Sequence, residues 1–123
     1  VISSYVSTLN ECSYSYANHW ANACHLMDDP EKAKKIEIAF KTRSLNNAFD
    51  GPQLALLKYA QKLTLNPGEM QKADVDALKA AGLNDGEILE TNQIIGYFNY
   101  VNRLLNGLGV STDGDTVGYY NSD

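Results

Sequence analysis

The sequence predicts an all-α protein, and three observations support this prediction. Apolar residues recur at every third or fourth position in one segment after another, which is the spacing of amphipathic helices. No segment shows the alternation of apolar and polar residues that is typical of a half-buried strand. Short stretches with Pro, Gly, Asp or Asn separate the periodic segments, as helix starts and ends require. We therefore expect a compact bundle of about six helices joined by short loops.

The first half of the chain contains three of the predicted helices. Apolar spacing predicts a helix over residues 2–9, followed by a turn at Asn10-Glu11. The next helix is expected from about Cys12 to Met27, with most of its surface buried. Asp28-Asp29-Pro30-Glu31 is then typical of a helix start, because Asp is a favourable N-cap and Pro fits the first helical position. That helix is expected to continue to about Arg43.

The second half is predicted to contain three more helices. One covers residues 53–64 and ends before Asn66-Pro67-Gly68, a sequence that interrupts helices. A shorter helix over residues 71–81 is followed by Gly82, and glycine is common just after a helix. Asn84-Asp85-Gly86-Glu87 then has the form of a capping box. It opens the longest helix, residues 85–106, which carries a broad apolar stripe.

Residues 1–110 are expected to form a single helical domain, and residues 111–123 a flexible C-terminal tail. The tail is rich in Asp, Gly, Ser and Thr and has no apolar periodicity. The chain starts inside an apolar periodic segment and lacks an initiator Met. We therefore interpret it as a fragment, a processed product or a truncated form.

The composition excludes several classes of function. The chain has 123 residues, a net charge of −5 and a pI of about 4.9, so neither nucleic acid nor an anionic membrane is an expected partner. No apolar run approaches the ~18 residues of a membrane span, and the first residues lack the pattern of a signal peptide. Hydrophobic residues make up 44% of the chain, which is typical of a globular protein.

The two cysteines, Cys12 and Cys24, are too few for a secreted disulfide framework. On one helix they would lie ~18 Å apart along the axis, beyond the ~7 Å between Cα atoms that a disulfide allows. Unpaired thiols fit a reducing compartment, so the expected location is the cytoplasm. Cys24 is expected in the core and His25 at the surface or in an interface.

The segment Cys12-Ser13-Tyr14-Ser15-Tyr16-Ala17-Asn18-His19 holds the candidate catalytic residues. In a helix, Cys12, Ser15 and His19 fall within a ~60° arc of one face, over about two turns. The dipole favours the thiolate form of a thiol near a helix N-terminus, and an imidazole on the same face can take or return a proton. The segment therefore indicates thiol chemistry, although a buried Cys is more commonly a small apolar core residue.

Asn10-Glu11-Cys12-x-Tyr14-Ser15-x-x-x-His19 resembles the N-x-C-x-Y-C-x-x-x-H active-site segment of alkylhydroperoxidase D-like proteins, within the carboxymuconolactone decarboxylase superfamily. The later part of the chain is similar to the uncharacterised peroxidase-related branch of that family. The similar segments are residues 54–65, 74–82, 85–88 and 96–104. The block Tyr97-Phe98-Asn99-Tyr100-Val101-Asn102-Arg103 is the most specific of them. In order and spacing the resemblance covers roughly residues 2–110.

The resemblance implies an alkylhydroperoxidase D-like fold and a homo-oligomer, from dimer to hexamer, that reduces hydroperoxides in antioxidant defence. It implies a hydroperoxide substrate, an external thiol or disulfide reductant, and no cofactor. Cys12 matches the first cysteine and His19 the relay histidine, while Ser15 stands where the family has its peroxide-attacking second cysteine. Family members also carry further N-terminal helices and a relay glutamate. That glutamate would lie just before Val1, and Glu11 is not its match.

Ser15 cannot replace a peroxidatic cysteine, because a serine hydroxyl is hardly ionised and forms no sulfenic acid. It also removes the motif disulfide, since Cys12 then has no thiol partner three residues on. Three explanations stay open: an engineered knock-out of the nucleophile, a lone peroxidatic Cys12 resolved by an outside thiol, or a change to other chemistry.

Three other functions compete with a peroxidase. A cofactor-independent carboxymuconolactone decarboxylase-like lyase would use His19 as acid and base, but no cluster of Arg or Lys near the motif would hold a carboxylate. A non-catalytic helical oligomerisation scaffold would explain the missing second thiol. A serine hydrolase based on Ser15 lacks the Gly-x-Ser-x-Gly turn. A metal site has little support, because His19 and His25 do not share a helix face and no carboxylate cluster completes a site.

Overall fold

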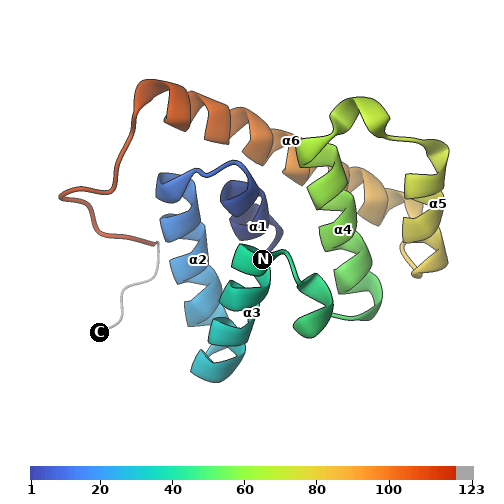
Figure 1. Cartoon of the computed structure of the whole chain (residues 1–123), viewed down its shortest axis with the longest axis horizontal. Coiled ribbons are helices and arrows are strands. Elements are labelled where there is room, and N and C mark those ends of the chain that lie inside the picture. The colour runs from blue at the N-terminus through green and yellow to red at the C-terminus, as the bar shows by residue number, and fades with distance from the viewer. Residues whose placement is uncertain (119–123) are drawn as a thin grey trace.

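The computed structural model describes residues 1–118, and in this range it contains α-helices and 3-10 turns but no strand. The helices are shown in Figure 1 and are α1 (Ile2–Leu9), α2 (Ser13–Met27), α3 (Pro30–Thr42), α4 (Gly51–Leu65), α5 (Lys72–Ala80) and α6 (Asp85–Leu108). Two 3-10 turns, η1 (Leu45–Asn47) and η2 (Pro67–Glu69), lie in the connections before and after α4. The predicted all-α bundle of six helices is therefore confirmed.

The short helix α1 lies at the centre of the bundle and contacts α2, α3, α4 and α6 (Figure 1). Two adjacent residues show how it joins the molecule. Tyr5 and Val6 are both completely buried, and they point into two different hydrophobic clusters. Tyr5 packs with α3, η1 and α4, whereas Val6 packs with α4, α5 and α6. The eight-residue helix α1 therefore contributes to both clusters and connects them.

The two clusters divide the core between the halves of the chain. The first contains Tyr5, Leu9, Ile36, Phe40, Leu45, Phe49 and Leu57. The second contains Val6, Tyr59, Ala60, Leu78, Ile88 and Ile95. Burial of such side chains is the main favourable contribution to folding, at about 1.5–3 kcal/mol for each large apolar side chain. Within α1, α3 and α6 the cluster residues recur at helical spacing, which is why periodicity predicted these helices well.

The helix starts agree with the sequence signals. Asp29 caps α3, where its carboxylate accepts a hydrogen bond of 3.1 Å from the backbone N–H of Lys32, and Pro30 follows at the first helical position. Asn84 and Glu87 form the predicted capping box of α6, with reciprocal bonds of 2.8 and 3.1 Å. Most helix ends lie within two residues of the predicted ones.

The predicted burial of the motif helix is wrong. Within α2 only Ser15 is buried, and Cys24, expected in the core, is half-buried; His25 is exposed as predicted. The reason is position in the fold, because α2 covers one side of α1 and its outer face has no neighbouring helix in Figure 1. Trp20 is also only partly buried, although it packs edge-on against Phe40 at 5.8 Å between ring centroids.

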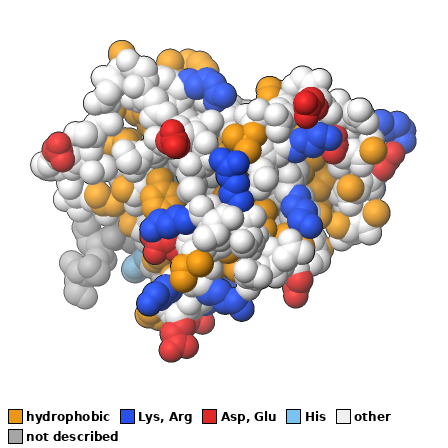
Figure 2. All heavy atoms as spheres, in the orientation of Figure 1, with side chains coloured by type: hydrophobic (Ala, Val, Ile, Leu, Met, Phe, Trp, Pro, Cys, Tyr) orange, Lys and Arg blue, Asp and Glu red, His pale blue; other side chains and the backbone are white. Residues whose placement is uncertain are grey.

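The predicted apolar stripe of α6 is wider than the surface that the core covers. Leu104 and Leu108 are 47% and 80% exposed, while the polar residues Thr91 and Asn102 are buried. Figure 2 shows one face of the molecule, on which charged side chains of both signs lie among apolar ones. No helix within residues 1–118 combines the length and the apolar character that crossing a membrane requires.

The segment after α6 lies against α2. Gly109 ends α6 in the left-handed conformation, with φ of 65°, and residues 111–118 contain no helix. The backbone N–H of Gly118 donates a hydrogen bond of 2.9 Å to Oδ1 of Asn18. Residues 119–123 of the predicted tail lie outside the described part of the chain. The mobility of the tail and the domain boundary at residue 110 stay predictions.

Candidate functional site

The turn between α1 and α2 sets the position of Cys12. Glu11 adopts φ of 52°, a left-handed conformation that non-glycine residues seldom adopt. The N–H of Glu11 donates to the carbonyl of Thr8 at 3.1 Å, and the N–H of Cys12 donates to that of Ser7 at 2.9 Å. This pair of bonds is the Schellman arrangement that ends a helix. Cys12 is thus fixed by the end of α1 and is also the N-cap of α2.

Cys12 lies in the interior, with an exposed fraction of 1%. Because it is the N-cap, it precedes the first turn of α2, and its backbone carbonyl accepts the N–H of Tyr16 at 2.9 Å. Ser15 follows at the third helical position, so the two residues hold the spacing of C-x-x-C pairs at helix N-termini. Both Cys12 and Cys24 are free thiols.

Ser15 and His19 line one pocket of about 490 Å³ between α2 and α6. Cys12 does not belong to the lining, so two of the three predicted site residues meet in this pocket and the third lies buried at the start of the helix. The pocket is lined by Tyr14, Ser15, Asn18, His19, Tyr97, Phe98, Val101, Leu105, Asp115, Thr116 and Gly118. We call it the His19 pocket. Its walls therefore combine the sequence motif, the second half of α6 and the segment after α6.

His19 contacts Phe98 of α6 edge-to-face, with 4.7 Å between the ring centroids. Burial lowers the pKa of His19 below its ordinary value of 6.5, because the charged imidazolium is poorly solvated there. His19 is therefore mainly neutral near pH 7 and can accept a proton. This contact places the block around Phe98 beside the motif helix.

A buried hydrogen-bond network lies behind Ser15. The Oγ atoms of Ser7 and Ser15 are 2.9 Å apart, and Nδ2 of Asn102 donates to Oγ of Ser7 at 3.2 Å. Ser7 and Asn102 are completely buried, and Ser15 is 3% exposed. Sequence reasoning missed this network. The signal that could have found it is the presence of Asn102 within an otherwise apolar stripe of α6, because a buried amide needs partners.

Asn10 connects that network to the turn before Cys12. Its Nδ2 atom donates to Oδ1 of Asn99 and to Oδ1 of Asn102, both at 3.0 Å. The backbone carbonyl of Asn10 accepts from Nδ2 of Asn106 at 2.9 Å. Arg103 donates to Oδ1 of Asn99 at 2.9 Å, at the solvent end of the network. Residues of α6 thus fix the turn that precedes the candidate catalytic segment.

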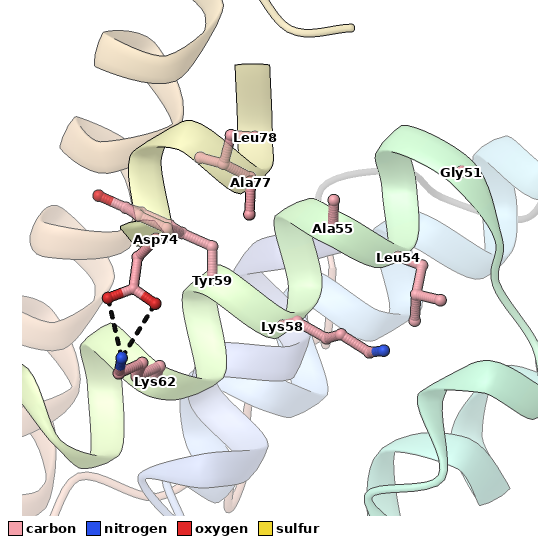
Figure 3. Close-up of a pocket in the computed structure, with 9 residues that line it drawn as sticks. All are labelled: Gly51, Leu54, Ala55, Lys58, Tyr59, Lys62, Asp74, Ala77 and Leu78. Atoms are coloured by element: carbon pink, nitrogen blue, oxygen red, sulfur yellow. Dashed lines mark hydrogen bonds and ion pairs between the residues drawn. The ribbon is translucent and has the colours of Figure 1, made fainter. Parts of the chain in front are cut away.

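A second pocket, of about 390 Å³, lies between α4 and α5 (Figure 3). Its most polar feature is the ion pair of Lys62 with both carboxylate oxygens of Asp74, at 2.9 and 2.8 Å. Asp74 also accepts a hydrogen bond from the backbone N–H of Gln71, so this carboxylate caps the start of α5. The pocket contains no Cys, His or Ser, and it offers no reacting group comparable to those of the His19 pocket. Within residues 1–118, no group of three or more His, Cys, Asp or Glu is placed to hold a metal ion.

No protein-family model matches the chain, and no curated protein matches it. Two uncharacterized peroxidase-related proteins are among the solved structures that are similar to the chain. One is an uncharacterized peroxidase-related protein from Silicibacter sp. TM1040, with a TM-score of 0.79 and 27% identity over 89% of this chain. The other, an alkylhydroperoxidase AhpD core described as an uncharacterized peroxidase-related protein from Ralstonia eutropha JMP134, has a TM-score of 0.74 and 25% identity over 86% of this chain. The chain has an alkylhydroperoxidase D-like fold.

The chain spans only 56% and 54% of the lengths of these two proteins. Their similarity confirms the resemblance to the peroxidase-related branch that the motif and the Tyr97–Arg103 block indicated. The residue pattern and the arrangement of the helices therefore agree on this alkylhydroperoxidase D-like fold.

The lowered pKa of His19 predicts a pH dependence of stability. Above pH 6.5, the ordinary pKa, His19 is neutral in both the folded and the unfolded state and contributes nothing. Below that value the unfolded chain binds more protons, so the free energy of unfolding falls until the pH passes below the folded-state pKa. Urea unfolding at a series of pH values should show this fall in the wild-type chain relative to His19→Gln. If the free energy of unfolding of the wild-type chain stays constant or rises relative to that of His19→Gln as the pH falls, the burial of the imidazole is contradicted.

Proposed function

We propose that this protein is a peroxidase-like thiol oxidoreductase that reduces hydroperoxides, with the His19 pocket as substrate site. The observation that carries the proposal is the placement of residue 15. It lies three residues after the N-cap Cys12, in the wall of a pocket that it shares with His19. An attacking group at this position would meet a substrate in the pocket, with a neutral imidazole one helical turn away to move the proton.

Ser15 supplies no electrons to a peroxide, so Cys12 must be the reacting thiol in this chain. His19 takes the thiol proton through a water, and the thiolate attacks one peroxide oxygen. The S–O bond forms as the O–O bond breaks, and the alkoxide leaves as an alcohol with the proton from His19. An external thiol then condenses with the sulfenic acid and releases water, and a second thiol restores Cys12 by disulfide exchange. Because Cys12 is buried, the first turn of α2 must open for this reaction, and turnover is slow.

We also propose that the protein is a homo-oligomer that acts in antioxidant defence in the reducing cytoplasm. The support for assembly is an exposed apolar stripe on α6, formed by Tyr97, Tyr100, Leu104 and Leu108. Their spacing of three and four residues places them on one side of the helix. An exposed apolar patch of this kind is typical of protein interfaces. The support for a reducing compartment is the pair of free thiols.

The structure gives no specific support for the lyase. A lyase acting on a carboxylated lactone needs a cation to hold the carboxylate, and the residues lining the His19 pocket include Asp115 but no Lys or Arg. A non-catalytic scaffold agrees with Ser15 and with the exposed stripe of α6. The two functions differ in what Ser15→Cys should do. Restoring the second thiol should increase peroxide consumption by a peroxidase, but not by a scaffold without a working site.

Restoring the missing thiol tests the peroxidase. With a dithiol reductant present, Ser15→Cys should consume an alkyl hydroperoxide at least about a hundredfold faster than the wild-type chain, because loss of an activated nucleophile commonly costs more than that. Its oxidised form should contain a disulfide between residues 12 and 15, detected by mass spectrometry. Cys12→Ser should abolish the slow wild-type reaction, whereas the matched control Cys24→Ser, on the same helix, should leave it unchanged. If Ser15→Cys folds and forms its disulfide but consumes no peroxide, the proposal is wrong and the scaffold takes its place.

The size of the protein in solution tests the assembly. Analytical ultracentrifugation of the wild-type chain should give a dimer or a larger oligomer, and the pair Leu104→Glu and Leu108→Glu should shift it to the monomer, because two carboxylates would be buried in the contact. Leu26→Glu, at a site on α2 that is 69% exposed, is the matched control and should keep the oligomer. A monomeric wild-type chain, or an oligomer that both changes leave intact, would contradict the role of the α6 stripe.

A further inference from the structure

Ser7 contacts both ends of the candidate catalytic segment. Its backbone carbonyl accepts the N–H of Cys12 at 2.9 Å, and its side chain lies 2.9 Å from Oγ of Ser15. Ser7 is completely buried in α1, so neither contact is shared with solvent. One residue outside the motif therefore contacts both Cys12, the reacting thiol of the proposed function, and residue 15, where Ser15→Cys restores a thiol.

The side chain of Ser7 has one hydrogen and two acceptors within reach. Oγ of Ser7 lies 2.8 Å from the backbone carbonyl of Ser3, in addition to its contact with Ser15. A hydroxyl donates one hydrogen and accepts through two lone pairs, so only one of the two acceptors receives it at a time. When residue 15 carries a hydroxyl hydrogen of its own, Ser7 can accept from it and donate to Ser3. When residue 15 is an anion, Ser7 can turn its hydrogen toward that group.

Asn102 holds the oxygen of Ser7 in place whether the hydroxyl hydrogen of Ser7 points to Ser3 or to residue 15. Nδ2 of Asn102 donates to Oγ of Ser7 at 3.2 Å, and Oδ1 of Asn102 accepts from Asn10 at 3.0 Å. The second hydrogen on Nδ2 of Asn10 is used by Asn99. Rotating the amide of Asn102 by half a turn would set its NH2 group against that of Asn10 and its oxygen against that of Ser7. The orientation of the amide is thus determined by the network, and it always presents a donor to Ser7.

We propose that Ser7 and Asn102 are positioning residues for residue 15, a buried pair that presents a hydroxyl hydrogen to a negatively charged group at that position. The inference rests on the proposed function only in taking the first turn of α2 as the reacting segment. Cys12 is the reacting thiol of the wild-type chain, and residue 15 carries a thiol in Ser15→Cys. A hydrogen bond to the charged form stabilises that form, and it does so more strongly where solvent is excluded. Ser15 then occupies a position whose surroundings are arranged for a thiolate.

Ser4 provides the matched control, because it lies on the same helix and is equally buried. Its Oγ atom is buried and has no hydrogen-bond partner within the described residues. Changing Ser4 or Ser7 to Ala removes the same hydroxyl from the same degree of burial. Only the change at Ser7 removes a group beside residue 15. Loss of the unpartnered Ser4 hydroxyl should also leave stability unchanged or raise it.

The experiment uses a chain with one thiol, made by combining Cys12→Ser, Ser15→Cys and Cys24→Ser. The pH dependence of alkylation by iodoacetamide gives the pKa of that thiol, whatever its accessibility. Adding Ser7→Ala should raise this pKa by about one unit or more, since a net hydrogen bond to a charged group is about that strong. Adding Ser4→Ala should leave it unchanged. Adding Ser7→Thr instead keeps the hydroxyl and should leave the pKa unchanged, which separates loss of the hydroxyl from any disturbance of α1.

An unchanged pKa in the Ser7→Ala chain, or an equal rise in the Ser4→Ala chain, would overturn the assignment. The measurement uses no peroxide, so its outcome is separate from that of the turnover experiment. A chain with Ser15→Cys that fails to reduce peroxide but shows the rise on loss of Ser7 would remove the proposed function and keep the positioning pair. If Ser15→Cys reduces peroxide but its thiol pKa is unchanged on loss of the Ser7 hydroxyl, the proposed function is kept and the positioning pair is removed.

Discussion

The site depends on the hydrogen bonds that the side chain of Asn10 donates to α6. Asn10 lies at the end of α1, two residues before Cys12, and it donates to two side chains of α6 that are 89 and 92 residues away in the sequence. A buried amide that loses a partner destabilises the protein by about 1–3 kcal/mol, while a fully paired network makes the structure rigid. The turn between α1 and α2 therefore cannot move away from α6 without breaking several bonds together. This constraint determines where α2 starts.

The start of α2 in turn determines the geometry of the site. The Schellman arrangement after α1 places Cys12 at the N-cap, which puts residue 15 in the first turn and His19 one turn later. His19 then meets Phe98, four residues before Asn102 on α6. The two segments that carry the resemblance, Asn10–His19 and Tyr97–Arg103, thus supply residues to two of the three walls of one pocket, and amides from both segments hold these walls together. The most specific residues of the sequence are those that connect these walls.

The helices could be predicted because their signals are local. The capping box at Asn84 and the Pro30 start act within a few residues, and the periodicity of α1 and α3 matches their buried faces. The shared position of Ser15 and His19 also followed from their spacing on one helix. The degree of burial was harder to predict, because it depends on which helices lie beside a face. For that reason α2 was expected to be more buried than it is, as was the end of α6 at Leu108.

The polar network could not be predicted, because the partner of a side-chain amide depends on the tertiary arrangement. Nothing local connects Asn10 with Asn102, and either could have been an exposed residue. The left-handed conformation of Glu11 could not be predicted either, since glycine usually occupies such a position and this chain has a glutamate there. Both features follow only once α1, α2 and α6 are placed together.

The most direct test is a double-mutant cycle between Asn10→Ala and Asn102→Ala, with the free energy of unfolding measured in urea for the wild-type chain, both single variants and the double variant. If Asn10 fixes the turn through Asn102, the two losses should be coupled by about 0.5–3 kcal/mol, because either change already breaks the shared bond. Losses that add within about 0.3–0.5 kcal/mol would show that the two amides act independently. In that case the start of α2, and with it the placement of residues 12 and 15, would depend on something other than this network.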